Sequence, residues 1–244
     1  MYTATSDQIV EAAKFRYCCR NFTDKKIPEK DFAALMEAAR WTPSPFGIEP
    51  WKVLVINDLQ LRHELSAALP GAQNGQLRSA SHFCVIFSAG EKWLNAEHGQ
   101  VYDFFKNVQQ QPPASMEYFH RTLGSFYPSI GLVDEMSYRT YATRSCHILL
   151  GNILTNASLM KIDSACMEGV NPDKMTELIK DKGLIDTEVY SAVLAIALGY
   201  REAEPAQPRI KKPLDDFVIY PGAENFAAPQ DNQQEKKNKK CNTH

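Results

Sequence analysis

Residues 38–51 read Ala-Ala-Arg-Trp-Thr-Pro-Ser-Pro-Phe-Gly-Ile-Glu-Pro-Trp, and they divide a predicted helix from a predicted strand. The helix covers residues 29–40, because apolar side chains recur there at three- and four-residue spacing after Pro28. Three prolines within eight residues then forbid helix continuation and predict a rigid, extended loop. The apolar run at 51–56 (WKVLVI) that follows predicts a buried strand.

The rest of the chain predicts further helices interleaved with short apolar strands. We expect helices at residues 8–15, 59–69, 138–160 and 172–182, and strands at 83–87, 162–166 and 190–199. The longest helix carries few charges over residues 146–159, so we expect it to be buried at the centre of the molecule. Residues 91–135 are rich in aromatic side chains and interrupted by prolines, which predicts a helical excursion. Four strands among helices indicate an α+β or three-layer α/β domain.

Length, composition and charge limit the classes of protein. The chain has 244 residues, 44% hydrophobic and 23% charged, which is ordinary for a globular protein with a sizeable core. We expect a single domain over residues 1–226 and a disordered polar tail over 227–244. The net charge of −2 gives no reason to expect nucleic acid or a membrane surface as a partner. No apolar run approaches the roughly 20 residues that span a bilayer.

The cysteines and histidines indicate a reducing compartment and no metal. The six cysteines contain no Cys-x-x-Cys pair and no signal peptide is evident, so we expect a cytoplasmic protein. The six histidines are scattered, with none paired at metal-ligand spacing, so we expect no metal site. We expect Cys18 and Cys19 to be inert thiols, because adjacent cysteines rarely form a relaxed disulfide.

A second stretch, Arg-Tyr-Cys-Cys-Arg-Asn-Phe at residues 16–22, carries two arginines four residues apart. Guanidinium groups at this spacing can hold a phosphate, although an exposed helix end is the simpler interpretation of either arginine alone. No Gly-x-Gly-x-x-Gly follows a strand and there is no P-loop, so the sequence excludes these two ways of holding a nucleotide.

Together the two stretches resemble the FMN-dependent nitroreductase family, whose motifs usually read Arg-x-Ser-x-Arg/Lys-x-Phe and Pro-Ser-Ser-x-Asn-x-Gln-Pro-Trp. Residues 167–169 (Met-Glu-Gly), 199–201 (Gly-Tyr-Arg) and 208–214 (Pro-Arg-Ile-Lys-Lys-Pro-Leu) match further family anchors in the same order. The resemblance spans roughly residues 8–218 and implies an α+β, three-layer sandwich. It also implies a central mixed sheet flanked by helices and an intertwined homodimer.

The resemblance further implies a role for individual residues. Arg16, Arg209 and Lys211 match positions that bind the FMN phosphate. Arg20 matches the basic residue beside the flavin pyrimidine edge, where a positive charge stabilises the reduced, anionic flavin. The loop with Pro43 matches the one that reaches the flavin of the other subunit. The expected cofactor-binding residues are Arg16, Tyr17, Cys18, Arg20, Pro43, Ser44, Pro45, Gly47, Gln73, Gln76, Met167, Glu168, Gly169, Arg209 and Lys211.

Several positions depart from the family pattern. Cys18 stands where the family usually has serine, and a thiol is a poorer hydrogen-bond donor to phosphate. Three further departures lie in the proline-rich loop, at Pro45, Gly47 and Glu49. Gln73 and Gln76 fall near the family's asparagine and lysine, which removes positive charge near the flavin. We therefore expect a reduced flavin that is less stabilised than in the nitro-reducing members.

The expected function is an FMN-dependent oxidoreductase that passes a hydride from NADH or NADPH to a nitroaromatic, a quinone or an activated enone. The family works by a ping-pong mechanism in which the cofactor performs the chemistry, so no catalytic side chain is expected. Several alternatives stay open at this point: a non-catalytic FMN storage or sensor protein, a dehalogenase or ene-reductase, and a globular interaction domain. Residues 91–135 are either plain core or a lid over the flavin.

Overall fold

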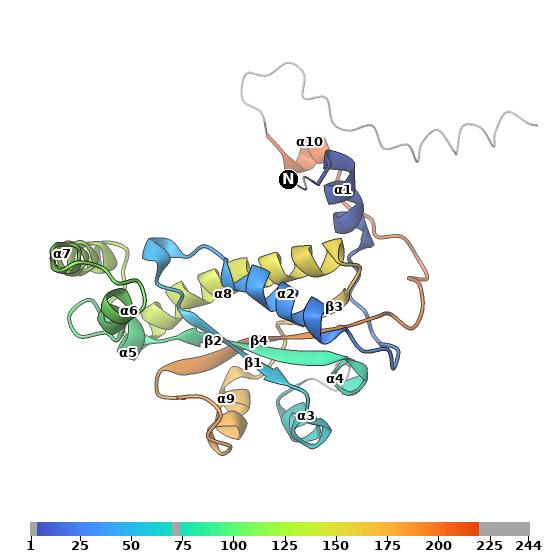
Figure 1. Ribbon diagram of the computed structural model, residues 1–244, viewed down its shortest axis with the longest axis horizontal. Helices are drawn as coiled ribbons and strands as arrows, with labels where there is room; N and C mark the ends of the chain where they lie inside the picture. The colour runs from blue at the N-terminus through green and yellow to red at the C-terminus, as the bar shows by residue number, and fades with distance from the viewer. Residues whose placement is uncertain (1–3, 70–73, 220–244) are drawn as a thin grey trace, which may run out of the picture. The chain divides into compact units, whose positions relative to one another are not determined.

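The computed structural model of the chain describes residues 4–69 and 74–219. These residues form two compact units, one ending at Glu204 and one beginning at Pro205 (Figure 1). The expected site residue Gln73 and the tail expected over 227–244 lie outside the described residues.

Four strands form one sheet in the first unit, in the order β1-β2-β4-β3. They are β1 (Trp51–Ile56), β2 (His82–Ala89), β3 (Asp163–Met167) and β4 (Tyr190–Gly199). All four predicted strands are thereby confirmed. The expectation of a mixed sheet is wrong for these strands, because every neighbouring pair runs antiparallel. Among the described residues the parallel pairing is an isolated bridge between Cys18 and Ser164, in a segment too short to form a strand.

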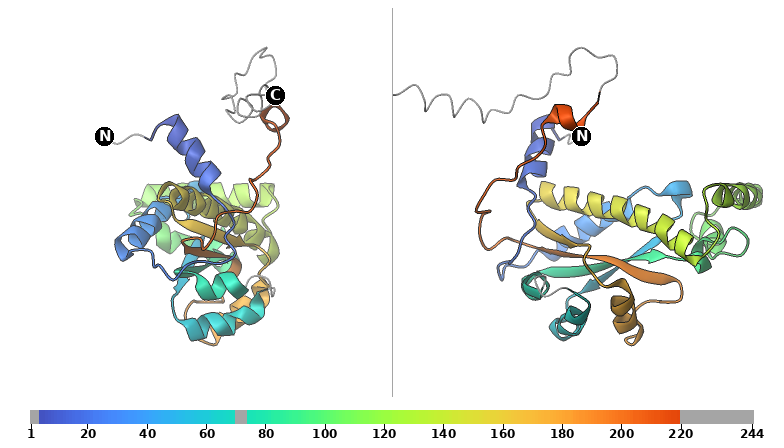
Figure 2. Two further views of the ribbon diagram at one scale, coloured as in Figure 1. Left: turned by 90° about the vertical axis from the view of Figure 1, so that its right-hand side faces the viewer. Right: turned by 180° about the vertical axis from the view of Figure 1, so that it is seen from behind.

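Helices cover both faces of the sheet and make three layers (Figures 1 and 2). The helices are α2 (Glu29–Arg40) and α8 (Glu135–Leu159) on one face, and α3 (Leu59–Leu65) and α9 (Pro172–Lys180) on the other. Alternate residues of β2 serve the two layers, since Cys84 and Ile86 pack with α2 and α8 while Phe83 and Val85 pack on the opposite side. Both faces are therefore buried, as the continuous apolar strands predicted.

Residues 91–135 form three helices, as expected for the aromatic excursion. They are α5 (Glu91–Leu94), α6 (Val101–Asn107) and α7 (Pro113–Ser129). Their aromatic rings pack against one another, with the rings of Phe105 and Phe119 stacked at 4.2 Å. The shorter elements are α1 (Ser6–Phe15), α4 (Asn74–Ser79), α10 (Leu214–Phe217) and the 3-10 turns η1 (Pro45–Gly47) and η2 (Ser66–Ala68).

The long helix α8 is buried along one face, so the expectation of a helix buried at the centre of the molecule holds for that face and is wrong for the opposite one. A stripe of its residues at three- and four-residue spacing is exposed, with Ile148 at 50% and Leu159 at 42%. The stripe consists of Met136, Thr140, Arg144, His147, Ile148, Gly151, Thr155 and Leu159. Gly151 lies in the same stripe, with no other atom within 4 Å of the position a Cβ would take. The low charge of this helix reflects an uncovered apolar face as well as a core face. Within the part of the chain that the structure describes, every helix is too short or too polar to cross a membrane.

Candidate functional site

The basic segment 16–22 lies against the edge strand β3. It begins at the end of α1, where the backbone N–H of Arg16 donates to the carbonyl of Ala12. Cys18 then forms the parallel bridge with Ser164, and the N–H of Cys19 donates to the Ser164 carbonyl at 3.4 Å. This pairing covers one edge of the sheet and fixes the backbone between the two arginines.

A buried polar atom beside Cys18 has no hydrogen-bond partner among the described residues. Gln76 is 2% exposed, and its Nε2 donates to the Cys19 carbonyl at 2.9 Å and lies 4.0 Å from the Cys18 Sγ. Its Oε1 is the unsatisfied atom. Because buried polar groups are nearly always satisfied, this oxygen is a candidate contact for a polar ligand.

Arg16 lies close enough to Cys166 to affect the pKa of its thiol. Burial raises the pKa of the Cys166 thiol, Cys18 adds to that rise, and the positive charge of Arg16 opposes it. Arg16 is half-buried while Arg20 is exposed, so the protein covers more of the Arg16 side chain than of the Arg20 side chain. Cys19 is buried, and its pKa is raised to about 11, chiefly by burial and then by Asp163. That thiol is neutral at physiological pH.

The predicted Met-Glu-Gly segment follows β3 directly. Met167 is buried in the core, whereas Glu168 and Gly169 are exposed. The Glu168 Oε1 lies 3.5 Å from the Nε2 of His147, on the exposed side of α8. The end of β3 and the uncovered face of α8 are therefore adjacent.

The proline-rich loop lies at the other end of the sheet. Its turn is held by the Gly47 carbonyl, which accepts from the Nε2 of Gln109 at 2.7 Å. Phe46 packs on Phe126 of α7, with ring centroids 5.7 Å apart. The strand register puts Trp51, directly after this loop, at the sheet end opposite the bridge to segment 16–22. Along β4 the two positions correspond to Ser191 and Leu198, seven residue steps or about 23 Å apart.

One chain therefore does not bring its two predicted half-sites together. Segment 16–22 and Gln76 lie at the end of the sheet where Ser164 pairs with Leu198, and the loop 43–47 leads into β1 at the other end. Glu168 and Gly169 follow Met167, which pairs with Ala195, so they lie between the two ends. Arg209 and Lys211 lie in the second unit, and their part in phosphate binding stays a prediction.

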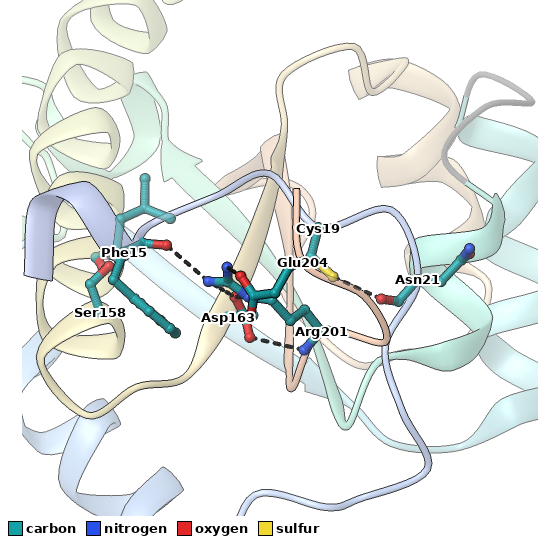
Figure 3. Close-up of polar contacts among 8 residues, drawn as sticks. Phe15, Cys19, Asn21, Ser158, Asp163, Arg201 and Glu204 are labelled. Carbon is teal, nitrogen blue, oxygen red and sulfur yellow. Dashed lines mark hydrogen bonds and ion pairs between the residues drawn. The ribbon is translucent and has the colours of Figure 1, made fainter. Parts of the chain in front are cut away.

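A buried ion pair that the sequence motifs do not predict lies at the end of the sheet where segment 16–22 pairs with β3. Arg201 and Asp163 form it, with side chains 10% and 4% exposed (Figure 3). The Gly-Tyr-Arg motif includes Arg201, but the sequence does not indicate which residue pairs with its charge. An aspartate at the start of an otherwise apolar strand was the available signal, because a buried carboxylate requires a partner.

The chain is similar in sequence to proteins of one known family. The model of the Nitroreductase family matches residues 13–200. A Staphylococcus saprophyticus protein provisionally named NAD(P)H nitroreductase is 34% identical over 218 residues, which cover 88% of this chain and 98% of that protein.

Solved structures share the fold at lower identity. A provisionally named nitroreductase from Exiguobacterium sibiricum, solved in complex with FMN, has a TM-score of 0.68 and 18% identity, covering 90% of this chain and 99% of that one. CLA-ER, an enone reductase of gut-bacterial fatty acid saturation metabolism, has a TM-score of 0.70 and 18% identity, covering 89% and 99%.

Proposed function

This chain belongs to the nitroreductase family, and from that premise we propose that it is an FMN-dependent oxidoreductase using NADH or NADPH. When bound, FMN supplies the hydride-transfer chemistry, and the protein supplies binding, orientation and electrostatics. The observation that carries the proposal is the unsatisfied buried Oε1 of Gln76, whose side chain lies against Cys18 and Cys19 of the basic segment.

The residues around Cys18 fit a flavin nucleotide. The Gln76 Oε1 is a buried acceptor for a ring N–H. A Cβ at Gly75 would lie 3.0 Å from the Asn21 Oδ1, so glycine keeps the backbone close to the basic segment. The half-buried Arg16 offers a guanidinium fork for a phosphate.

The remaining residues have separate proposed tasks. Arg209 and Lys211 add positive charge at the phosphate. Arg20 is exposed and stabilises negative charge on the reduced pyrimidine edge. The backbone of Glu168 and Gly169 orients the reactive edge of the flavin, where glycine permits a close approach. No side chain of this set has to exchange a proton with the substrate for the reaction to proceed.

We infer that a second copy of the chain completes each site. The strand that follows the proline-rich loop begins about 23 Å along the sheet from the segment 16–22 of its own chain. A loop from the partner subunit can meet that segment if the two chains pack through the exposed stripe of α8. The apolar Ile148 and Leu159 and the uncovered Gly151 give that stripe the chemistry of a helix interface.

The proposed acceptors are nitroaromatics, quinones or activated enones, reduced by a ping-pong mechanism in which donor and acceptor use one site in turn. The fold shared with CLA-ER, an enone reductase, supports including the enones. Storage or sensing of FMN without turnover is the competing function.

Anaerobic spectroscopy tests the proposal. The purified protein is expected to be yellow, to bleach with NADH or NADPH, and to reoxidise with at least one nitro, quinone or enone compound of a panel. A colourless protein that takes up no FMN would contradict the proposal. A yellow protein that neither NADH nor NADPH bleaches would favour storage or sensing instead.

A further inference from the structure

Arg201 makes several hydrogen bonds and ion pairs beside the candidate site. Its Nε donates to the Asp163 Oδ1 at 2.7 Å, its Nη2 lies 2.6 Å from the same oxygen, and its backbone N–H donates to Oδ2 at 2.9 Å (Figure 3). Both side chains are largely removed from water, 10% and 4% exposed. A desolvated pair with this many hydrogen bonds fixes both side chains in one geometry.

The same guanidinium also holds the end of α1. Its Nη2 donates to the carbonyl of Phe15 at 2.9 Å, so it caps the last turn of the helix. The two sequence neighbours of Arg16 have aromatic rings that face the Arg201 guanidinium. Its Cζ lies 4.3 Å from the centre of the Phe15 ring and 5.9 Å from the centre of the Tyr17 ring. Cation–π contact therefore holds both neighbours of Arg16.

The backbone around Arg201 fastens the other end of the basic segment. Arg201 forms an antiparallel bridge with Phe22, and the N–H of Glu202 donates to the Asn21 carbonyl at 3.2 Å. The segment 16–20 is thus a short loop that is attached at both ends to Arg201, just after β4. The Arg201 guanidinium thus contacts both sequence neighbours of Arg16.

We propose that Arg201, held by Asp163, is a positioning residue that sets where Arg16 meets the phosphate of a bound flavin nucleotide. This inference rests on the proposed FMN site. The role requires arginine, because the planar fork reaches Asp163 and the Phe15 carbonyl together, and the single ammonium of lysine cannot keep both directions. A purely structural ion pair would affect the flavin ring and its phosphate alike.

Binding of FMN and of riboflavin to the apoprotein separates the two roles, because riboflavin lacks the phosphate. Flavin fluorescence quenching gives both Kd values for the wild type, Arg201→Lys, Asp163→Asn and Arg16→Gln. Arg201→Lys and Asp163→Asn are each expected to raise the Kd for FMN about tenfold while changing that for riboflavin by less than about twofold. Adding Arg201→Lys to Arg16→Gln is expected to cause no further loss, since both act on one contact.

Glu204→Gln is the matched control. Glu204 contacts the outer Nη1 of Arg201 at 3.0 Å but is 82% exposed, so both Kd values are expected to stay at the wild-type level. Circular dichroism checks folding, and Asp163→Asn decides the question if Arg201→Lys does not fold.

The outcomes are distinguishable. If Arg16→Gln lowers the preference for FMN over riboflavin and both Arg201→Lys and Asp163→Asn keep it, the positioning role is wrong and the proposed function stands. If the wild-type apoprotein binds neither flavin, the proposed function is wrong and the positioning role falls with it.

Discussion

The Nη1 of Arg62 donates a hydrogen bond to the carbonyl oxygen of Ala80 at 2.7 Å, in a core where Arg62 is only 2% exposed. Its other close partners are also carbonyl oxygens, those of Ile56 at 2.7 Å and Ser81 at 3.2 Å. Burial lowers the pKa of this guanidinium. Backbone dipoles thus stabilise a buried cation that ties the end of β1 to the end of α4, the helix that carries Gln76.

Arg62→Met is expected to lower the free energy of unfolding by about 3 kcal/mol, because several buried carbonyl oxygens lose their donor together. Urea denaturation measures the change. The control is Lys182→Met, which removes a half-exposed ion pair with Glu64 on the same helix and is expected to cost no more than about 1 kcal/mol. Equal effects of the two substitutions would contradict a structural role for Arg62.

Stability is expected to fall at alkaline pH because of the buried thiols. Burial raises the pKa of Cys84, and likewise of Cys146, from 9.0 to about 12. Above pH 9 these thiols ionise in the unfolded chain but stay neutral in the folded one. Their contribution is complete below pH 9 and is lost as the pH rises towards 12, at up to about 1.4 kcal/mol per pH unit for each thiol.

Urea denaturation between pH 8 and pH 11 checks this dependence. Cys84→Ala removes one of the titrating groups, so its stability is expected to fall less steeply with pH than that of the wild type. Parallel pH profiles would mean that Cys84 does not contribute.

Arg20 and Arg209 are expected to act on different properties of the flavin. Arg20→Ala should slow reduction by NADH or NADPH more than it weakens FMN retention, because its charge serves the reduced ring. Arg209→Ala should do the reverse, because its charge serves the phosphate. Stopped-flow reduction and FMN titration measure the two properties, and equal effects of both substitutions would contradict the separate roles.

The exposed stripe of α8 is expected to be the subunit interface. Ile148→Asp should weaken dimerisation at least about tenfold, because it places a charge in the centre of an apolar contact. Light scattering after gel filtration measures the mass as a function of concentration. Leu184→Asp, at a residue exposed to a similar 46% beyond α9, should leave the mass unchanged. A dimer that survives Ile148→Asp would place the interface elsewhere.

Apolar periodicity and proline positions predicted most of the first unit's architecture. The helix at 29–40 and the strands at 51–56 and 190–199 begin and end where the sequence places them, because each is bounded by prolines, by polar residues or by glycine. The direction of each strand was not predictable in this way. Pairing depends on long-range contacts that a local pattern does not contain.

The candidate site shows the same limit. The motifs predicted Cys18 and Gln76 as site residues, and in the structure the Cys18 Sγ and the Gln76 Nε2 lie 4.0 Å apart. They did not locate the partner of Arg201, since Asp163 is 38 residues away and is recognisable only as a charge in an apolar strand. The resemblance assigned residues 16–22 and 43–47 to the flavins of different subunits, but their positions at opposite ends of the sheet follow from the strand register, which a local pattern does not contain.

Subunit complementation tests most directly the central claim that each flavin site combines two chains. Arg16→Glu disrupts the phosphate half of the site, Pro45→Arg disrupts the loop half, and each variant alone is expected to bind no FMN. Mixed dimers of the two variants are expected to recover about one FMN per dimer, because one site then receives both intact halves. Mixed dimers that bind no FMN would contradict the account, since that result follows if both halves come from the same chain.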